Sequence, residues 1–144
     1  MYQITRERAG VGGMPPKGEV RVVVETPGPN GVSLSPNQQQ LYIADVKTSM
    51  VRVHRIAKDG RLEGGRDFAA LRVDGLKTDE AGNVWMASRD GVYVYDAGGQ
   101  ALGRIVTPEG PSNCCWGSGF RGLYSTARTS VYHVPTKVPG TRTF

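Results

Sequence analysis

A polar residue at the head of a short strand pattern recurs three times along this chain, about 40 residues apart. The three repeats begin at Asn30, Asp74 and Asn113, at intervals of 44 and 39 residues. The apolar run that follows each of them keeps nearly the same spacing, at Leu41, Val84 and Leu123. A period of about 40 residues with four short strands per unit is typical of β-propeller blades. The sequence therefore predicts an all-β fold of about three four-stranded blades.

Turn-forming residues divide the chain into short segments. Its 144 residues include 20 glycines and 9 prolines, and the apolar residues come as short β-branched or aromatic runs without helical periodicity. The length suffices for one domain with a core. We expect residues 1–18, rich in glycine and proline, to be a flexible segment. Residues 19–144 then form the half-propeller domain.

The strands can be placed from the apolar runs and the turns between them. An unpaired first strand is expected at 19–25, which is dense in β-branched residues. The three units are expected at 31–35, 40–44, 50–56 and 66–70; at 75–78, 83–87, 91–95 and 102–106; and at 113–117, 122–126 and 130–134. Pro135 and Pro139 interrupt the chain after the last of these, so the third unit lacks a fourth strand.

Charge and hydropathy exclude several classes of partner. The 18 basic and 13 acidic residues give a net charge of +5, but the basic residues are scattered from Arg6 to Arg142, which does not indicate a nucleic-acid surface. No apolar run approaches membrane-spanning length, and the first residues lack an apolar signal core, so a cytoplasmic location is expected. Cys114 and Cys115 are adjacent and would point to opposite faces of a strand, so we expect buried free thiols rather than a disulfide.

The three repeated polar residues suggest a cation site. The first strand of a propeller blade lies nearest the central axis, so Asn30, Asp74 and Asn113 would converge on one channel mouth. Oxygen ligands from several separate elements are what a hard cation such as calcium requires. Asp45, which ends the second strand, could also line the channel or could cap a turn. Asparagine and aspartate are also common turn formers beside glycine, and this alternative stays open for all of them.

The motifs in this order resemble those of the gluconolactonase/regucalcin (senescence marker protein) family. The resemblance covers roughly residues 19–138 and rests on the segments at 29–36, 41–45, 73–76, 83–87, 111–117 and 123–128. The family forms a six-bladed propeller, and its members are calcium- or zinc-dependent lactonases and esterases. The resemblance implies that this chain corresponds to the C-terminal half of that fold.

The resemblance also implies roles for two residues. Asn30 matches the family's metal-binding asparagine, and Asp74 matches the aspartate that binds metal and serves in acid/base chemistry. The family's third ligand, a glutamate in an early Glu-Gly-Pro motif, has no counterpart, because Glu19 stands in a different context. The substrate-contacting asparagine of an Asn-Asp motif is missing as well.

Two functions follow as hypotheses. The first is a metal-dependent hydrolase of lactones or esters, with Asp74 as general base and metal ligand, Asn30 as second ligand, and calcium favoured over zinc. The second is a non-catalytic propeller fragment or binding module without a complete metal site. In either case three blades cannot close a ring, so we expect two chains to form a head-to-tail homodimer in which strand 19–25 of each chain completes the third unit of the other.

Overall fold

The computed structural model describes residues 22–117 and 119–142, which form three antiparallel sheets. The first sheet consists of β1 (Pro29–Leu34), β2 (Gln40–Asp45), β3 (Met50–Ile56) and β4 (Leu62–Ala69). The second consists of β5 (Leu76–Thr78), β6 (Val84–Ser88), β7 (Gly91–Tyr95) and β8 (Ala101–Ile105). The third has the order β11-β10-β9, with β9 (Asn113–Gly117), β10 (Gly122–Thr126) and β11 (Val131–Pro135).

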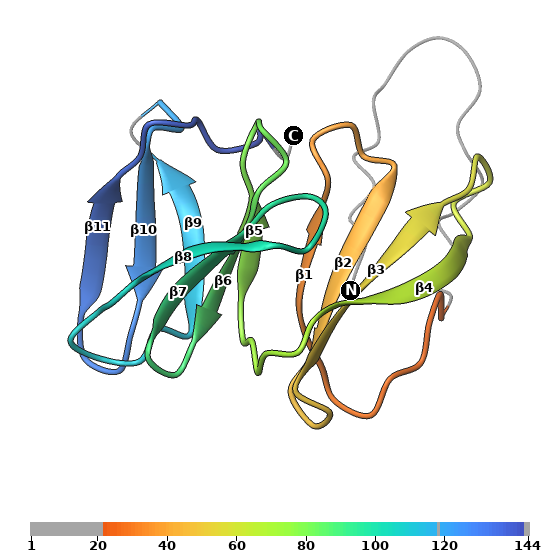
Figure 1. The fold of residues 1–144 in the computed structure, drawn as a ribbon, viewed down its shortest axis with the longest axis horizontal. Coiled ribbons are helices and arrows are strands. Elements are labelled where there is room, and N and C mark those ends of the chain that lie inside the picture. The colour runs from red at the N-terminus through yellow and green to blue at the C-terminus, as the bar shows by residue number, and fades with distance from the viewer. Residues whose placement is uncertain (1–21, 118, 143–144) are drawn as a thin grey trace, which may run out of the picture.

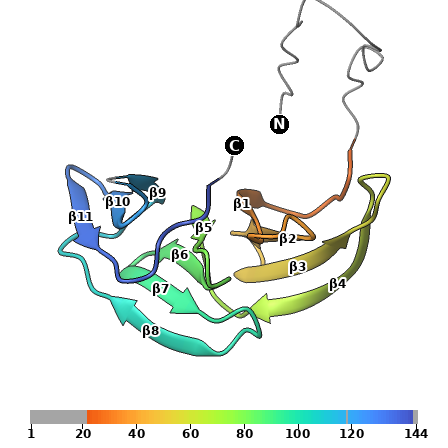
Figure 2. The ribbon, with the colours of Figure 1, turned by 90° about the horizontal axis from the view of Figure 1, so that it is seen from above.

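The three sheets stand side by side as the blades of an open arc (Figure 1). Seen from above, they fan around a centre, with the first strands β1, β5 and β9 on the concave side and β4, β8 and β11 on the convex side (Figure 2). β5 lies against both β1 and β9. This arrangement confirms the all-β fold and the blades predicted from the repeat. We call the three sheets blade 1, blade 2 and blade 3 in chain order.

Most strand boundaries agree with those expected from the sequence, and two segments differ. β4 begins at Leu62 rather than at residue 66, because its glycine-rich start pairs with β3 through an irregular register. Residues 22–25, the described part of the expected strand 19–25, are not in a strand, so this prediction is wrong for the single chain. Val22 and Val23 are 75% and 48% exposed. β-branched residues favour a strand, but they form one only where a partner strand is available.

Each core lies between two blades rather than within one. Blades 1 and 2 enclose a cluster that contains Tyr42, Val51, Leu76 and Met86, all nearly inaccessible to solvent. The ring of Phe68 meets that of Tyr42 edge to face at a centroid distance of 5.0 Å. Blade strands are therefore covered on their faces by neighbouring blades, which explains apolar runs without alternation.

A smaller cluster joins blades 2 and 3. Cys114 and Leu123 are buried there, and the rings of Trp85 and Trp116 meet edge to face at 5.4 Å. Burial in this apolar contact raises the pKa of the Cys114 thiol to about 12. Cys115 points to the other face of β9 and is exposed, so the expectation of two buried thiols is wrong for Cys115.

The segment after β11 ties blade 3 back to blade 2. Gly140 forms an antiparallel bridge with Asp79, and the amide of Glu80 donates to the carbonyl of Pro139 at 2.8 Å. Trp116 Nε1 donates to the carbonyl of Thr78 at 2.8 Å beneath this segment. We call residues 136–142 the C-terminal strap. The strap contacts the C-terminal end of β5, at Thr78, whereas Asp74 precedes the N-terminal end of this strand.

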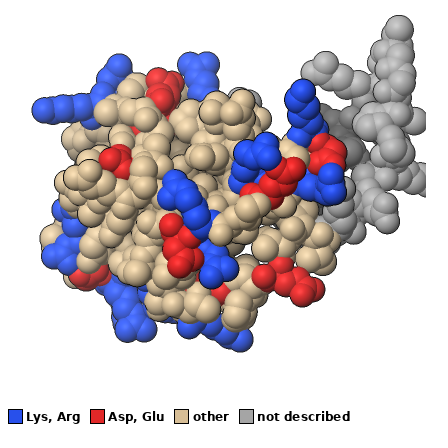
Figure 3. Space-filling model, turned by 45° about the vertical axis from the view of Figure 1, so that its right-hand side comes forward, with Lys and Arg blue, Asp and Glu red and all other residues tan. Residues whose placement is uncertain are grey.

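The surface has a mixed charge. On the side shown in Figure 3, basic and acidic groups lie beside one another between larger uncharged areas. Ion pairs such as Arg52–Asp67 at 3.1 Å account for part of this mixing. Residues 22–117 and 119–142 contain no helix that is long and apolar enough to cross a membrane.

Candidate metal and catalytic site

Two of the residues singled out in the sequence meet between blades 1 and 2. Asn30 lies at the start of β1, and Asp74 lies two residues before β5. The side-chain amide of Asn30 donates from Nδ2 to Asp74 Oδ1 at 3.3 Å, although 44 residues separate them. The repeat places both at the same end of the first strands. The sequence thus identified a pair that the fold brings into contact.

Glycines allow the blades to approach closely at this point. A Cβ atom at Gly31 would lie 2.4 Å from the carbonyl oxygen of Asp74. A Cβ atom at Gly75 would lie 2.2 Å from Asn113 Oδ1 and 2.8 Å from the Asn113 Cα. All three distances are shorter than non-bonded atoms tolerate, so any larger residue at Gly31 or Gly75 would push the first strands apart. The glycines after Asn30 and after Asp74 therefore allow the first strands to come close enough to form the site.

Asn113 lies against Gly75, and its position in blade 3 is one residue away from the one that the sequence repeat predicts. The amide of Asp74 donates to the carbonyl of Ala87 at 3.0 Å, and in blade 3 the corresponding bond runs from Ser112 to the carbonyl of Thr126 at 2.8 Å. Ser112 is thus the backbone counterpart of Asp74, and Asn113 stands one residue further on, against Gly75. The Oδ1 atom of Asn113 accepts the amide of Cys114 at 2.8 Å.

An arginine that the sequence analysis did not single out borders the same carboxylate. Arg72 Nη1 lies 3.7 Å from Asp74 Oδ1, and the two side chains are 37% and 32% exposed. The Ser88 hydroxyl donates to the Arg72 carbonyl at 2.8 Å and holds the backbone there. No motif marks an arginine two residues before an aspartate, so only the structure could reveal this contact.

Asp45 has a separate and local role. Its carboxylate accepts the amides of Lys47 and Thr48 at 2.9 and 3.1 Å and the hydroxyl of Thr26. The Thr26 hydroxyl is the main cause that lowers the pKa of Asp45, with the two amides in support. These bonds correspond to the turn-capping alternative for Asp45, at the β2–β3 turn.

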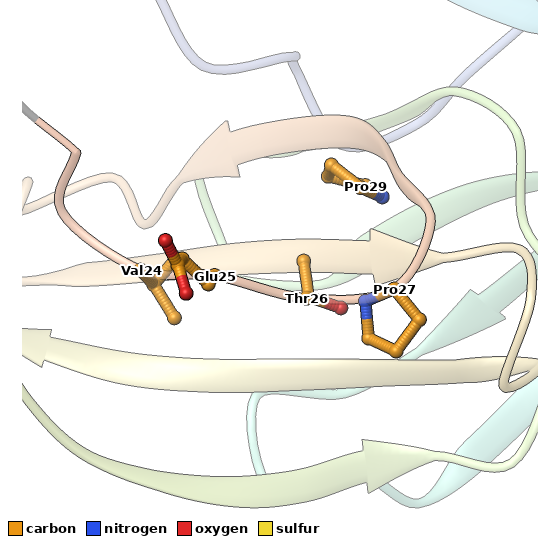
Figure 4. A pocket seen from close by; sticks show the side chains of 5 residues that line it. All are labelled: Val24, Glu25, Thr26, Pro27 and Pro29. Carbon is orange, nitrogen blue, oxygen red and sulfur yellow. The ribbon is translucent and has the colours of Figure 1, made fainter.

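Two hollows lie under the segment that leads into β1. The larger, of about 570 Å³, is lined by the residues shown in Figure 4, from Val24 to Pro29. The smaller, of about 250 Å³, reaches Asp45, Arg52 and His54. Neither is lined by Asn30 or Asp74, so neither encloses the site described above.

The donors at the site suit part of a hard-cation shell. Asp74 supplies a carboxylate, and the side chains of Asn30 and Asn113 carry amide oxygens, the ligand type that calcium prefers. Within the described residues no group of three His, Cys, Asp or Glu side chains lies close enough together to hold a metal ion. Calcium takes six to eight oxygens, and the remaining ones would have to come from water or from further protein groups.

A family comparison gives this site a context. A family model described as the SMP-30/Gluconolactonase/LRE-like region matches residues 7–129. A gluconolactonase of Zymomonas mobilis is 30% identical over 127 residues, which is 78% of this chain and 36% of that protein.

Solved structures of gluconolactonases are also similar to this chain. A gluconolactonase of Xanthomonas campestris is 33% identical with a TM-score of 0.70, over 77% of this chain and 38% of its own. A putative gluconolactonase is 30% identical with a TM-score of 0.72, over 79% and 40%. A calcium-binding protein, regucalcin, of Agrobacterium tumefaciens shares the fold at a TM-score of 0.69 and 17% identity, over 81% and 48%. The chain spans less than half the length of each of these proteins.

Proposed function

Because the chain belongs to the SMP-30/gluconolactonase/LRE-like family, we propose that it carries part of the site of a metal-dependent hydrolase of lactones or esters. Asp74 is the general base and a metal ligand, and Asn30 is a second ligand. The observation that carries this proposal is the contact between Asn30 and Asp74 across two blades at 3.3 Å. Relatives named gluconolactonase at 30–33% identity support the lactone as substrate class.

The chemistry requires a base beside the carbonyl of the substrate. A bound divalent ion polarises a carbonyl and acidifies water when present. Asp74 accepts the proton of the attacking water, whose oxygen forms a bond to the carbonyl carbon. The bond from that carbon to the ring oxygen then breaks, and the ring oxygen leaves as a hydroxyl group with the proton that Asp74 had accepted. The product is an open-chain hydroxy acid. The hydrogen bond from Asn30 holds the Asp74 carboxylate in position during the reaction.

Calcium is the proposed ion. The donors at the site are a carboxylate and amides, and hard oxygens of this kind bind calcium in proteins. The single carboxylate also supports the second candidate, a non-catalytic binding module with an incomplete site. Hydrolytic activity that depends on calcium separates the two candidates.

The proposal is tested by hydrolysis of a simple aldonolactone, followed as acid release at constant pH. We expect the full chain to release acid faster with calcium than with a chelator, and Asp74→Asn to lose at least about 100-fold of that rate, the lower range for a general base. Asp96→Asn is the matched control, because Asp96 caps a distant turn through Gly98 and Gln100. Full activity in Asp74→Asn would contradict the role of Asp74, and no activity in the wild type would favour the binding module.

We further propose that the chain acts as a homodimer of six blades. Blade 3 has three strands where blades 1 and 2 have four, so the outer edge of β11 is open within the described chain. Val22 and Val23 are exposed and belong to no strand. Addition of residues 19–25 of a second chain to β11 would give both a partner. Two-fold symmetry would bring a second set of Asn30, Asp74 and Asn113 to the same channel.

A further inference from the structure

Two donor groups, one neutral and one positively charged, approach the carboxylate oxygen Asp74 Oδ1 in the structure. Asn30 Nδ2 approaches it at 3.3 Å from blade 1, and Arg72 Nη1 approaches it at 3.7 Å from the segment before β5. Both are donors, and Arg72 also carries a full charge. The Asp74 oxygen that would bind a metal ion therefore already lies next to a positively charged side chain, Arg72.

The position of Arg72 is fixed, while its side chain has room to move. The Ser88 hydroxyl bonds its carbonyl at 2.8 Å, and Val73, between Arg72 and Asp74, is fully buried. The guanidinium itself is partly exposed, and its distance of 3.7 Å is longer than a good hydrogen bond. Partly exposed ion pairs of this kind are weak. Arg72 can therefore leave Asp74, but its backbone keeps it near the site.

We propose that Arg72 is a built-in counter-ion that competes with a divalent cation for Asp74 and thereby weakens cation binding at this site. This inference rests on the proposed function, because it takes Asp74 as a ligand. Two effects act in the same direction. The ion must break the contact between Arg72 and Asp74, and a doubly charged ion on Asp74 then stands within a few ångströms of the arginine charge. For partly solvated groups this repulsion corresponds to a factor of about ten in a binding constant.

Two other roles for Arg72 make different predictions. If Arg72 only stabilised the fold, its removal would lower the melting temperature and leave cation binding unchanged. If Arg72 positioned Asp74 for the ion, its removal would weaken cation binding. The competition proposed here is the role in which removing the charge strengthens binding.

The experiment measures calcium binding to the full chain by isothermal titration calorimetry at low ionic strength. Arg72→Gln removes the charge and keeps a polar side chain, and we expect it to bind calcium about ten times more tightly than the wild type. Arg72→Lys keeps the charge and should bind as the wild type does. Arg61→Gln is the matched control, because it removes the same charge from the β3–β4 turn, where Arg61 pairs with Asp59 at 2.6 Å. Its calcium affinity should stay at the wild-type value.

The outcomes separate this inference from the proposed function. Binding by the wild type with equal or weaker binding by Arg72→Gln overturns the role of Arg72 and leaves Asp74 as a ligand. Absence of calcium binding in both proteins overturns the metal site and this inference together. A difference between the two proteins that persists undiminished in high salt would also contradict it, because repulsion between partly exposed charges is screened. Thermal unfolding of each variant confirms that the fold is intact.

Discussion

At the scale of single residues, the site depends on glycines as much as on polar side chains. Gly31 and Gly75 follow Asn30 and Asp74, and each lies in close contact with the neighbouring blade. In the sequence these glycines look like ordinary turn residues beside an asparagine or an aspartate. The structure shows a different requirement, which is space for the first strand of the neighbouring blade.

Gly75→Ala is predicted to destabilise the protein by about 1–3 kcal/mol, the usual cost of an overpacked contact. The new Cβ would collide with both the side chain and the backbone of Asn113, so no rotation of one side chain relieves the clash. Gly103→Ala is the control, because a Cβ at Gly103 in β8 meets nothing within 4 Å. Chemical denaturation measures both variants. Equal stability of the two would contradict the close packing of β5 on Asn113.

The sequence pattern predicts one of the contacts around Asp74 and misses others, for definite reasons. Asn30 and Asp74 were predicted because their repeat spacing places them at equivalent strand ends. Asn113 stands one residue beyond the backbone counterpart of Asp74, because blade 3 uses one residue more than blade 2 between the equivalent points of its first two strands: Ser112 to Thr126 is 14 residues, and Asp74 to Ala87 is 13. Arg72 was missed because its role comes only from the proximity of Asp74 Oδ1, which no repeat encodes.

At the scale of strands and turns, two hairpins share one design with different burial. Asp79 and Asp96 each begin a turn in which their own amide bonds the carbonyl four residues on, and each carboxylate accepts that residue's amide at 2.9 Å. Asp79 is fully buried, and its second oxygen accepts the Asn83 side chain at 2.8 Å and Trp85 Nε1 at 2.9 Å. The C-terminal strap also pairs with this turn, through the bridge between Asp79 and Gly140.

Asp79→Asn is predicted to lower the free energy of unfolding by about 1–3 kcal/mol, because one carboxylate oxygen becomes an amide group that faces two donors. Asp96→Asn, at the exposed version of the same turn, should cost less than half as much, since water can satisfy the new group. Urea denaturation of both variants gives the comparison. If the two substitutions had the same effect, the Asp79 carboxylate would not be the anchor of this turn.

The strand bounds were predictable where turn-forming residues flank a short β-branched, aromatic or otherwise apolar segment. β3, β7, β9 and β10 have the bounds expected from the sequence. β4 was placed too late, because Gly64 and Gly65 hide an edge strand whose pairing with β3 is irregular. Residues 22–25 show the opposite case, in which a strong β-branched pattern has no neighbouring strand within the chain.

At the scale of the whole molecule, the arc has two end faces that no blade of the same chain covers in the described structure (Figure 2). On blade 3, Tyr124 and His133 stack on each other with ring centroids 4.6 Å apart, and Val131 is 66% exposed. On blade 1, the segment before β1 lies over Asp45 and His54 around a hollow of about 250 Å³. In the dimer proposed above, the blades of a second copy would cover these faces.

The proposed dimer makes a prediction that depends on one short segment. If residues 19–25 of one chain pair with β11 of the other, the full chain should sediment as a dimer at micromolar concentration. Val23→Pro should shift it toward the monomer, because proline removes a backbone donor and cannot continue a paired strand. Val106→Pro is the control, since Val106 is 69% exposed and follows the last residue of β8. A folded wild-type monomer would refute the dimer. A dimer that persists after deletion of residues 1–25 would refute the exchange of this strand and leave only the packing of the end faces.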